Sequence, residues 1–427
     1  MKRIYLLLYD AAWQLTGLLL PVAARLNDKM KRFVEGRQDA LNNTAWRDFN
    51  RPLAWFHVSS LGEFEQARPL MEAFHAQYPH YQILLTFFSP SGYEVRKDYQ
   101  GANHVAYLPY DTPKNSRLWY DTYQPSIVFW AKYDYWYHFL TEARRRKLPL
   151  ILFSALFRPE QVFFKPWGSL HRAMLHAFTH IFVQDVQSKQ LLKHHLGIEA
   201  QVTGDTRIDR VCAIAAQRSS LPEIERFIGD KTCWIVGSAW KEDIQVIVPY
   251  LQSHQGKQQV ILAPHDISEP MLKSIEEMLP VASIRYSQWK NLASETRTHR
   301  PEVLIIDCIG MLASLYAYGK VAFVGGAFKQ GLHNILEAAV YGVPVLFGAP
   351  HYKKFREAIE LIAAGGAFAV RNAREFEQCM NKLLSEEDTY RQAAQAAHHY
   401  VQRNSGATAS ILNSIRHCLT EQNQPQS

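Results

Sequence analysis

The chain has few cysteines, and its histidines form no metal-binding motif. Its five cysteines are odd in number and widely spaced, without a Cys-x-x-Cys pair. This argues against a disulfide framework or a zinc site and favours a reducing, cytoplasmic setting. No His-Glu-x-x-His motif occurs among the 18 histidines. His194 and His195 precede Gly197, so we expect them at a solvated helix end and not in a metal pair.

Several motifs of common enzyme classes are missing as well. The sequence contains no Gly-x-Ser-x-Gly elbow, which argues against a serine hydrolase. It also lacks the Walker A motif and the Gly-x-Gly-x-x-Gly fingerprint. These absences argue against a P-loop NTPase and a simple dinucleotide oxidoreductase. No internal repeat or low-complexity tract stands out.

The composition is that of a folded protein with an anionic partner. Hydrophobic residues make up 47% of the 427 residues and charged residues 20%, as in globular domains. This length predicts two α/β domains. The formal charge of +7 favours a phosphate ligand, an acidic lipid surface or nucleic acid. The aromatic residues show no RNA-binding signature, so we do not expect nucleic acid.

An apolar segment, 4–26, begins the chain, but it is not a clean apolar run. Asp10 and Gln14 interrupt it, which argues against a signal peptide and against a spanning helix. Basic residues flank it on both sides: Lys2, Arg3, Arg25, Lys29, Lys31 and Arg32. We favour a helix that lies in or partly inserts into the membrane, with Tyr9 and Trp13 near the interface. The alternative is a helix packed on its own domain.

Strand and helix patterns alternate twice along the chain. Strands are predicted at 55–59, 82–88, 104–108, 126–130, 148–153, 180–183 and 201–204, and again at 232–236, 259–263, 302–306, 321–324 and 343–347. We predict a membrane-associated helix with its basic flank at 1–35, Rossmann-like domains at 36–215 and 216–420, and a disordered tail at 421–427. Such domains bind ligands at the carboxyl ends of their strands, so we expect a ligand in the cleft between them.

The most informative segment is 321–348, whose pattern predicts a strand, a glycine-rich loop, a helix and a second strand. The first strand breaks at Gly325 and Gly326, and Asn334 is a suitable N-cap for the helix that follows. A helix N-terminus after a strand attracts anions through free N–H groups and its dipole. Glu337 could accept hydrogen bonds from ribose hydroxyls. The segment indicates a nucleotide-phosphate site, and the alternative is a purely structural unit.

Glu63 is the first candidate for acid–base chemistry. It follows a strand and the turn formed by Ser60, Leu61 and Gly62. A carboxylate there could take a proton from an alcohol nucleophile. The alternative is that Glu63 only complements the helix dipole.

Three further groups of residues follow predicted strands. Lys132 and Asp134 could pair with each other or position a charged sugar. Arg207 suits a carboxylate or phosphate, although an ion pair with Asp205 or Asp209 is an equal alternative. A third group outlines one pocket at neighbouring strand ends in the second half: Pro264-His265, Ile309-Gly310-Met311 and the segment from Asn334 to Glu337.

Together these motifs resemble the 3-deoxy-D-manno-octulosonic acid (Kdo) transferases of lipopolysaccharide synthesis. The similarity covers nearly the whole chain. It rests on the order and spacing of the motifs at 60–63, 89–92, 107–111, 203–209, 323–326 and 333–337. The family has the GT-B fold, with two Rossmann-like domains that face a cleft, and works without a metal ion. The resemblance therefore implies no cofactor.

The resemblance also implies roles for individual residues. Glu63 matches the general base, and Lys132 and Arg207 match positions that stabilise the transition state. Asp134 keeps the second carboxylate of its motif. The positions that match the CMP-binding segments are Pro264, His265, Ile309, Gly310, Met311, Asn334, Ile335, Leu336 and Glu337. Lys132, Arg207, His265 and Met311 depart from the residue types usual in the family, where Glu, Lys, Arg and Glu stand.

The implied reaction is inverting transfer of Kdo from CMP-Kdo to the lipid A precursor, lipid IVA. The implied location is the cytoplasmic face of the inner membrane, on an anionic surface. Two alternatives stay open. One is another GT-B nucleotide-sugar transferase or an epimerase, and the other is a catalytically silent protein that binds the membrane surface.

Overall fold

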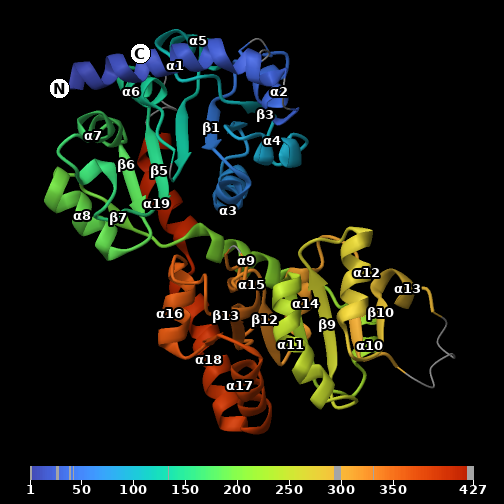
Figure 1. The fold of residues 1–427 in the computed structure, drawn as a ribbon. Coiled ribbons are helices and arrows are strands. Elements are labelled where there is room, and N and C mark those ends of the chain that lie inside the picture. Colours follow the sequence, from blue (N-terminus) through green and yellow to red (C-terminus); the bar gives the residue numbers. More distant parts are fainter. Residues whose placement is uncertain are drawn as a thin grey trace. The chain divides into compact units, whose positions relative to one another are not determined.

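The structure, a computed structural model, describes residues 2–25, 28–37, 40–41, 43–132, 134–292, 300–329 and 331–420. The predicted disordered tail, 421–427, lies outside the described residues. The chain divides into two compact units (Figure 1). Unit 1 contains residues 1–210 and 405–427, and unit 2 contains residues 211–404.

Unit 1 is built on a seven-stranded parallel sheet in the order β3-β2-β1-β4-β5-β6-β7. The strands are β1 (Leu53–Val58), β2 (Gln82–Phe87), β3 (His104–Tyr107), β4 (Ile127–Ala131), β5 (Leu150–Ala155), β6 (His180–Val183) and β7 (Gln201–Val202). The helices are α1 (Lys2–Ala24), α2 (Asp28–Glu35), α3 (Leu61–Gln77), α4 (Pro90–Arg96), α5 (Pro113–Tyr123), α6 (Tyr137–Arg145), α7 (Ser169–Leu175), α8 (Val186–Leu196) and α19 (Ala407–Thr420). A 3-10 turn, η1, spans Val162–Phe164.

Both faces of the unit 1 sheet are buried, which explains why its strands read as continuous apolar runs and not as alternating ones. Leu53 and Trp55 of β1 belong to one core cluster, and Ala54 and Phe56 belong to another. Successive side chains of a strand point to opposite faces of its sheet. The sheet therefore separates two apolar layers, one packed with residues of α5 and α6 and the other with residues of α3.

Unit 2 repeats the pattern with the strand order β10-β11-β9-β8-β12-β13-β14, also parallel throughout. The strands are β8 (Cys233–Ala239), β9 (Gln259–Pro264), β10 (Ser283–Arg285), β11 (Val303–Ile305), β12 (Val321–Val324), β13 (Val345–Gly348) and β14 (Ala367–Val370). The helices are α10 (Pro222–Ile228), α11 (Lys241–Ser253), α12 (Glu269–Met278), α13 (Tyr286–Trp289), α14 (Leu312–Leu315), α15 (Leu336–Ala339), α16 (Arg356–Ala364), α17 (Ala373–Ser385) and α18 (Glu387–Asn404), with a 3-10 turn, η2 (Tyr316–Tyr318). The helix α9 (Thr206–Ala216) spans the point at which the chain passes from unit 1 to unit 2.

The predicted alternation is confirmed, whereas two short strands were missed. No apolar pattern predicts β10 or β14, the two edge strands of the unit 2 sheet. An edge strand has one neighbour instead of two, and these strands are only partly buried. A half-buried strand of three or four residues leaves little apolar signal in a sequence.

The last helix corrects the predicted domain boundary. The sequence placed residues 216–420 in one domain, but α19 belongs to unit 1. Its apolar side chains, Ile411, Leu412, Ile415 and Leu419, join the core cluster that covers one face of the unit 1 sheet. Figure 1 shows this red helix beside the strands of unit 1. Burial of this apolar stripe decides the placement, and sequence order alone does not reveal which sheet it covers.

The helix α1 packs against unit 1 through the residues that were expected to face the membrane interface. The Tyr9 hydroxyl donates to Asp111 Oδ2 at 2.5 Å. The Trp13 ring lies 5.7 Å from the Trp136 ring. Asp10, which interrupts the apolar run, lies 2.6 Å from His138 Nε2. Aromatic packing and the Asp111 carboxylate therefore hold Tyr9 and Trp13 against the rest of unit 1, and their expected position near the membrane interface stays a prediction.

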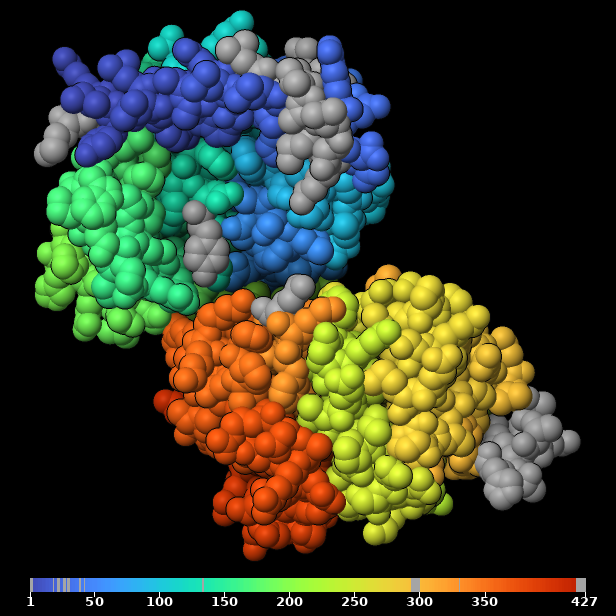
Figure 2. Space-filling model, viewed as in Figure 1, coloured from blue at the N-terminus to red at the C-terminus, as the bar shows by residue number. Residues whose placement is uncertain are grey.

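The face of α1 next to this packed side is apolar and exposed, and Figure 2 shows the helix in dark blue on the surface of unit 1. Its large exposed side chains are Ile4, Leu7, Leu8, Leu15 and Leu19, which are 58–68% exposed. Within the described part of the chain, no helix has the length and hydropathy needed to cross a membrane.

Candidate active site

Glu63 lies in the first turn of α3, in a capping box with Ser60. Its Oε2 accepts hydrogen bonds from the backbone N–H groups of Ser59 at 2.7 Å and Ser60 at 2.8 Å, and from the Ser60 hydroxyl at 3.2 Å. The side chain is 7% exposed. All three bonds reach Oε2, and among the described residues none reaches Oε1. Helix capping is thus present, and it leaves one carboxylate oxygen available for chemistry.

The electrostatic surroundings of Glu63 differ from those of an ordinary helix cap. Burial, together with the nearby charge of Asp134, raises the pKa of Glu63 from 4.5 to about 7, against the opposing effect of the Ser59 and Ser60 hydrogen bonds. Burial also raises the pKa of Asp134, which the Ser59 hydroxyl partly offsets. The carboxyls of buried Glu63 and half-buried Asp134, which follow the adjacent strands β1 and β4, therefore share one region. A carboxyl that titrates near neutral pH is suited to proton transfer.

Lys132, Asp205 and Arg207 form a second charged group in unit 1. Arg207 Nε lies 2.9 Å and Nη2 2.8 Å from Asp205 Oδ2, and Gln66 donates to Asp205 Oδ1 at 3.0 Å. Burial alone would raise the pKa of Asp205, but the charges of Arg207 and Lys132 outweigh it and lower that pKa to about 2. Lys132 is itself 6% exposed. Both predicted cations thus act on one buried carboxylate.

Asp209, the other partner considered for Arg207, has a different role. Its two carboxylate oxygens accept hydrogen bonds from the backbone N–H groups of Gly406 and Thr408, each at 2.6 Å. These groups lie at the start of α19, so Asp209 caps that helix. The carboxylate therefore holds the returning helix, and the Arg207 pair forms with Asp205.

In unit 2 the predicted nucleotide-binding residues come from one edge of the sheet. Pro264 ends β9, Ile309-Gly310-Met311 follows β11, and Asn334 to Glu337 follow β12. The strand order places β8 between β9 and β12. The end of β8 was not expected to contribute, yet it carries Trp240, which directly follows this strand.

Trp240, His265 and His333 form a stack of rings at this edge. The His265 ring lies 4.5 Å from the Trp240 ring and 4.5 Å from the His333 ring. Trp240 Nε1 donates to His333 Nε2 at 3.3 Å. Lys329 Nζ lies 3.6 Å above the Trp240 ring. Burial, with the neighbouring His265, lowers the pKa of His333 to about 4, so this ring is neutral at pH 7.

Sequence reasoning missed Trp240, His333 and Lys329 as site residues. The apolar pattern predicts a strand at 232–236, whereas β8 continues to Ala239. An aromatic residue just past a buried strand was the signal available for Trp240. His333 is the first residue of the 333–337 motif, but the motif predicts a nucleotide-binding role only for Asn334 to Glu337. The contact between the loops after β9 and β12 depends on tertiary structure.

The segment 334–337 departs from its prediction in two ways. The helix α15 is one turn long, and Ile335 occupies its N-cap position, not Asn334. Ile335 and Leu336 are buried in the core, so only their backbone groups are candidates for ligand contact. Asn334 instead donates to Glu337 Oε1 at 3.0 Å and accepts from the Leu336 N–H at 3.2 Å. A one-turn helix has a small dipole, which weakens the expected helix-terminus anion site.

The two glycines before this segment are required by close packing. Gly326 has φ +96°, and a Cβ there would lie 2.4 Å from the Gly331 carbonyl oxygen. Its N–H donates to Asp243 Oδ2 at 2.9 Å, which also accepts from the Trp240 N–H at 2.9 Å. Asp243 thereby ties the start of α11 to the loop after β12.

The segment after β11 is the most open part of the predicted site. Ile309 is 88% exposed, and Gly310 has φ +98° with open space around its Cβ position. Met311 occupies the N-cap position of α14, and its sulfur lies 3.3 Å from Cys308 Sγ. These residues share the sheet edge with His265, and no contact joins them to the ring stack among those the structure describes.

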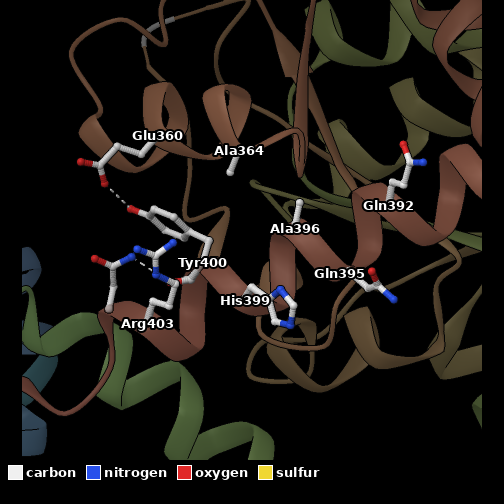
Figure 3. Close-up of a pocket in the computed structure, with 9 residues that line it drawn as sticks. Glu360, Ala364, Gln392, Gln395, Ala396, His399, Tyr400 and Arg403 are labelled. Atoms are coloured by element: carbon white, nitrogen blue, oxygen red, sulfur yellow. Dashed lines mark hydrogen bonds between the residues drawn. The ribbon is translucent and has the colours of Figure 1, made fainter.

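Two other features of the described residues contain none of the predicted site residues. A cavity of about 630 Å³ lies between α16 and α18 (Figure 3), where Tyr400 donates to Glu360 at 2.7 Å. In unit 1, possible ligand atoms of His180, His417 and Cys418 lie within 4.8 Å of one another. The Cys418 sulfur is 3.4 Å from each Nε2. The expected absence of a metal stays a prediction.

Comparison with known families agrees with the motifs. Residues 27–210 match the model of the family described as 3-deoxy-D-manno-octulosonic-acid transferase (kdotransferase). The chain is 29% identical to the 3-deoxy-D-manno-octulosonic acid transferase of Chlamydia pneumoniae, over 74% of this chain and 73% of that protein. It is 27% identical to the transferase of the same name from Bordetella pertussis, over 86% and 88%.

Solved structures share the fold at low sequence identity. The UDP-GlcNAc 2-epimerase from Neisseria meningitidis superposes with a TM-score of 0.61 at 16% identity, covering 86% of this chain and all of that one. A glycosyltransferase from Rickettsia africae gives 0.55 at 13% identity, over 87% and 99%. The two Rossmann-like units thus have the GT-B fold. With the motifs that surround Glu63 and His333, these matches show that the chain is similar to the 3-deoxy-D-manno-octulosonic acid transferase family of glycosyltransferases.

Proposed function

We propose that this enzyme transfers Kdo from CMP-Kdo to the lipid A precursor, lipid IVA, and that Glu63 is the general base. The single observation that carries the role of Glu63 is a buried carboxyl whose pKa is about 7 and whose Oε1 accepts no bond from the described residues. At neutral pH a substantial fraction of this carboxyl is ionised, and its conjugate acid is weak enough to retain the proton that it takes.

The proposed step is an in-line displacement with inversion. A glucosamine hydroxyl of the acceptor attacks the anomeric carbon of Kdo while Glu63 takes the hydroxyl proton. The bond from the anomeric carbon to the phosphate oxygen breaks, and its electron pair leaves with CMP. The transition state has oxocarbenium character, as in glycoside hydrolysis. Lys132 and Arg207 supply positive charge on the unit 1 side, where both already act on Asp205.

The carboxyl edge of the unit 2 sheet is the proposed CMP site. Trp240, His265 and His333 offer ring faces and N–H groups, and Lys329 offers a cation. Aromatic stacking and a cation together suit a nucleotide, whose base is planar and whose phosphate is anionic. No metal ion is required by this proposal.

The acceptor is a lipid, so we propose that the enzyme works on the cytoplasmic face of the inner membrane. The exposed apolar row of α1 supports this, since side chains such as Leu8 and Leu15 can enter the interfacial layer while the helix stays packed on unit 1. The double variant Leu8→Gln, Leu15→Gln should reduce binding to anionic vesicles by at least tenfold. Unchanged binding in a flotation assay would contradict this role for α1.

The test of the reaction is release of CMP from CMP-Kdo with and without lipid IVA. We expect release that depends on the acceptor and a lipid product one Kdo heavier, detected by mass spectrometry. A titration of CMP against UDP separates this donor from that of other GT-B enzymes, and tighter binding of UDP would contradict the proposal. The variant Glu63→Ala should lower turnover by about 10²- to 10⁴-fold with CMP affinity retained.

A further inference from the structure

An apolar cavity of about 450 Å³ lies in unit 1 between α1, α2 and the segments that follow β2 and β4. Trp13, Phe33, Phe88 and Trp136 are four of its lining side chains. None of its lining residues carries a charge. The two hydroxyl groups in the wall are already used, because Tyr9 donates to Asp111 and Thr16 donates to the Ala12 carbonyl. The cavity therefore suits an apolar ligand.

The wall of this cavity is built from the chain segments that carry the candidate base. Phe88 directly precedes Ser89, whose N–H donates to the Ser59 carbonyl at 2.7 Å, and the Ser59 N–H donates to Glu63. Trp136 lies two residues after Asp134, and its ring packs 4.3 Å from the Phe88 ring. The cavity wall and the two carboxyls are therefore carried by the same chain segments.

The surface around the cavity suits an anionic amphiphile. The lining residues of α1, such as Trp13 and Thr16, occupy one side of the helix, and the exposed leucines, such as Leu8 and Leu19, occupy the neighbouring side. The helix α2, which contributes Phe33 to the wall, carries exposed Arg32 beside it. An apolar chain can thus pass from the exposed row into the cavity while an anionic headgroup stays near a cation.

We propose that this cavity takes one acyl chain of the lipid acceptor during transfer, which rests on the proposed function. Its volume admits on the order of ten methylene groups, since a methylene is close in size to a water molecule of about 30 Å³. That is enough for part of a single chain. Seating one chain fixes the distance between the acyl region and Glu63, so it selects which hydroxyl of the headgroup meets the base.

The kinetic test fills the cavity from α1 and compares two acceptors. Ala12→Phe adds a ring from a lining position, and Thr16→Trp does so one turn further along. Gln14→Phe is the matched control, because this exposed residue of the same helix is not among those that line the cavity. We expect both filled variants to lower, at least tenfold, the ratio of kcat/KM for lipid IVA to that for its deacylated, water-soluble headgroup. Gln14→Phe should keep this ratio. An equal ratio in all variants would overturn the proposal.

A binding test separates the cavity from the proposed reaction. The probe is 12-bromododecanoic acid below its micellar concentration, whose bromine quenches nearby tryptophan fluorescence. Quenching should occur in the wild type, weaken in Trp13→Phe and Trp136→Phe, and fall at least fivefold in Ala12→Phe. Quenching without any Kdo transfer would retain the cavity and reject the proposed function. Equal quenching in Ala12→Phe and Gln14→Phe, or transfer without site-dependent quenching, would reject the cavity.

Discussion

Replacing Glu63 with glutamine should stabilise the protein and inactivate it at the same time. The pKa of Glu63 rises from 4.5 to about 7 on folding, so the folded state disfavours the ionised carboxyl. Below pH 4.5 the group is protonated in both states and has no effect on stability. Between pH 4.5 and about pH 7, Glu63 ionises in the unfolded chain but stays protonated in the folded protein, which lowers the free energy of unfolding of the wild type.

The size of the effect follows from the same pKa. One pKa unit is worth about 1.4 kcal/mol, so a rise from 4.5 to about 7 costs the ionised protein about 3 kcal/mol. Glutamine carries no charge and can still accept the Ser59 and Ser60 bonds through its carbonyl oxygen. We expect Glu63→Gln to exceed the wild type by about 1 kcal/mol at pH 5 and by about 3 kcal/mol at pH 8.

The assay is urea unfolding of both proteins from pH 5 to pH 8, followed by tryptophan fluorescence. Glu65→Gln is the control, because Glu65 lies on the same helix in a partly exposed pair with Arg96 at 3.0 Å. Its loss should cost no more than about 1 kcal/mol. A Glu63→Gln protein less stable than the wild type at pH 8, or a difference that does not change with pH, would refute the assigned electrostatics. Activity should rise about tenfold per pH unit below pH 7 in the wild type and be lost in Glu63→Gln.

Three other results are expected. Arg207→Ala should lower the free energy of unfolding at pH 7 by about 2 kcal/mol, because the lowered pKa of Asp205 stabilises the folded state at every pH above 3.8, the pKa of an unfolded aspartate. This loss of stability should disappear as the pH falls from about 4 to 2. An unchanged urea midpoint at pH 7 would contradict the prediction. Trp240→Ala should weaken CMP binding at least fivefold in calorimetry, consistent with about 1–3 kcal/mol for stacking on an aromatic ring, whereas Trp167→Ala, at an exposed position in unit 1, should not. Turnover should survive exhaustive treatment with EDTA, and loss of activity that Zn²⁺ or Mg²⁺ restores would show a metal requirement.

The candidate base illustrates how far the sequence reaches. A strand, a Ser-Leu-Gly turn and a carboxylate in the first helical turn predict the position of Glu63 at a helix N-terminus, and the capping bonds to Ser59 and Ser60 became visible only in the structure. Its raised pKa was not predictable, because it arises from burial and from Asp134, which the fold brings from the end of β4. The choice between Asp205 and Asp209 as partner for Arg207 was equally open in the sequence. It depended on where α19 begins, since Asp209 caps that helix.

The sequence by itself determined every strand except β10 and β14, the glycine-broken loop at Gly326 and the strand ends that bear polar residues. These features depend on apolar runs and local backbone preferences, which are determined by residues close together in the sequence. Tertiary structure decided that α19 returns to unit 1, that Trp240 joins His265 and His333, and that α1 packs its aromatic side inward with its leucines exposed. Such contacts join residues far apart in the chain, and their free energy comes from burial and complementarity that no local pattern encodes.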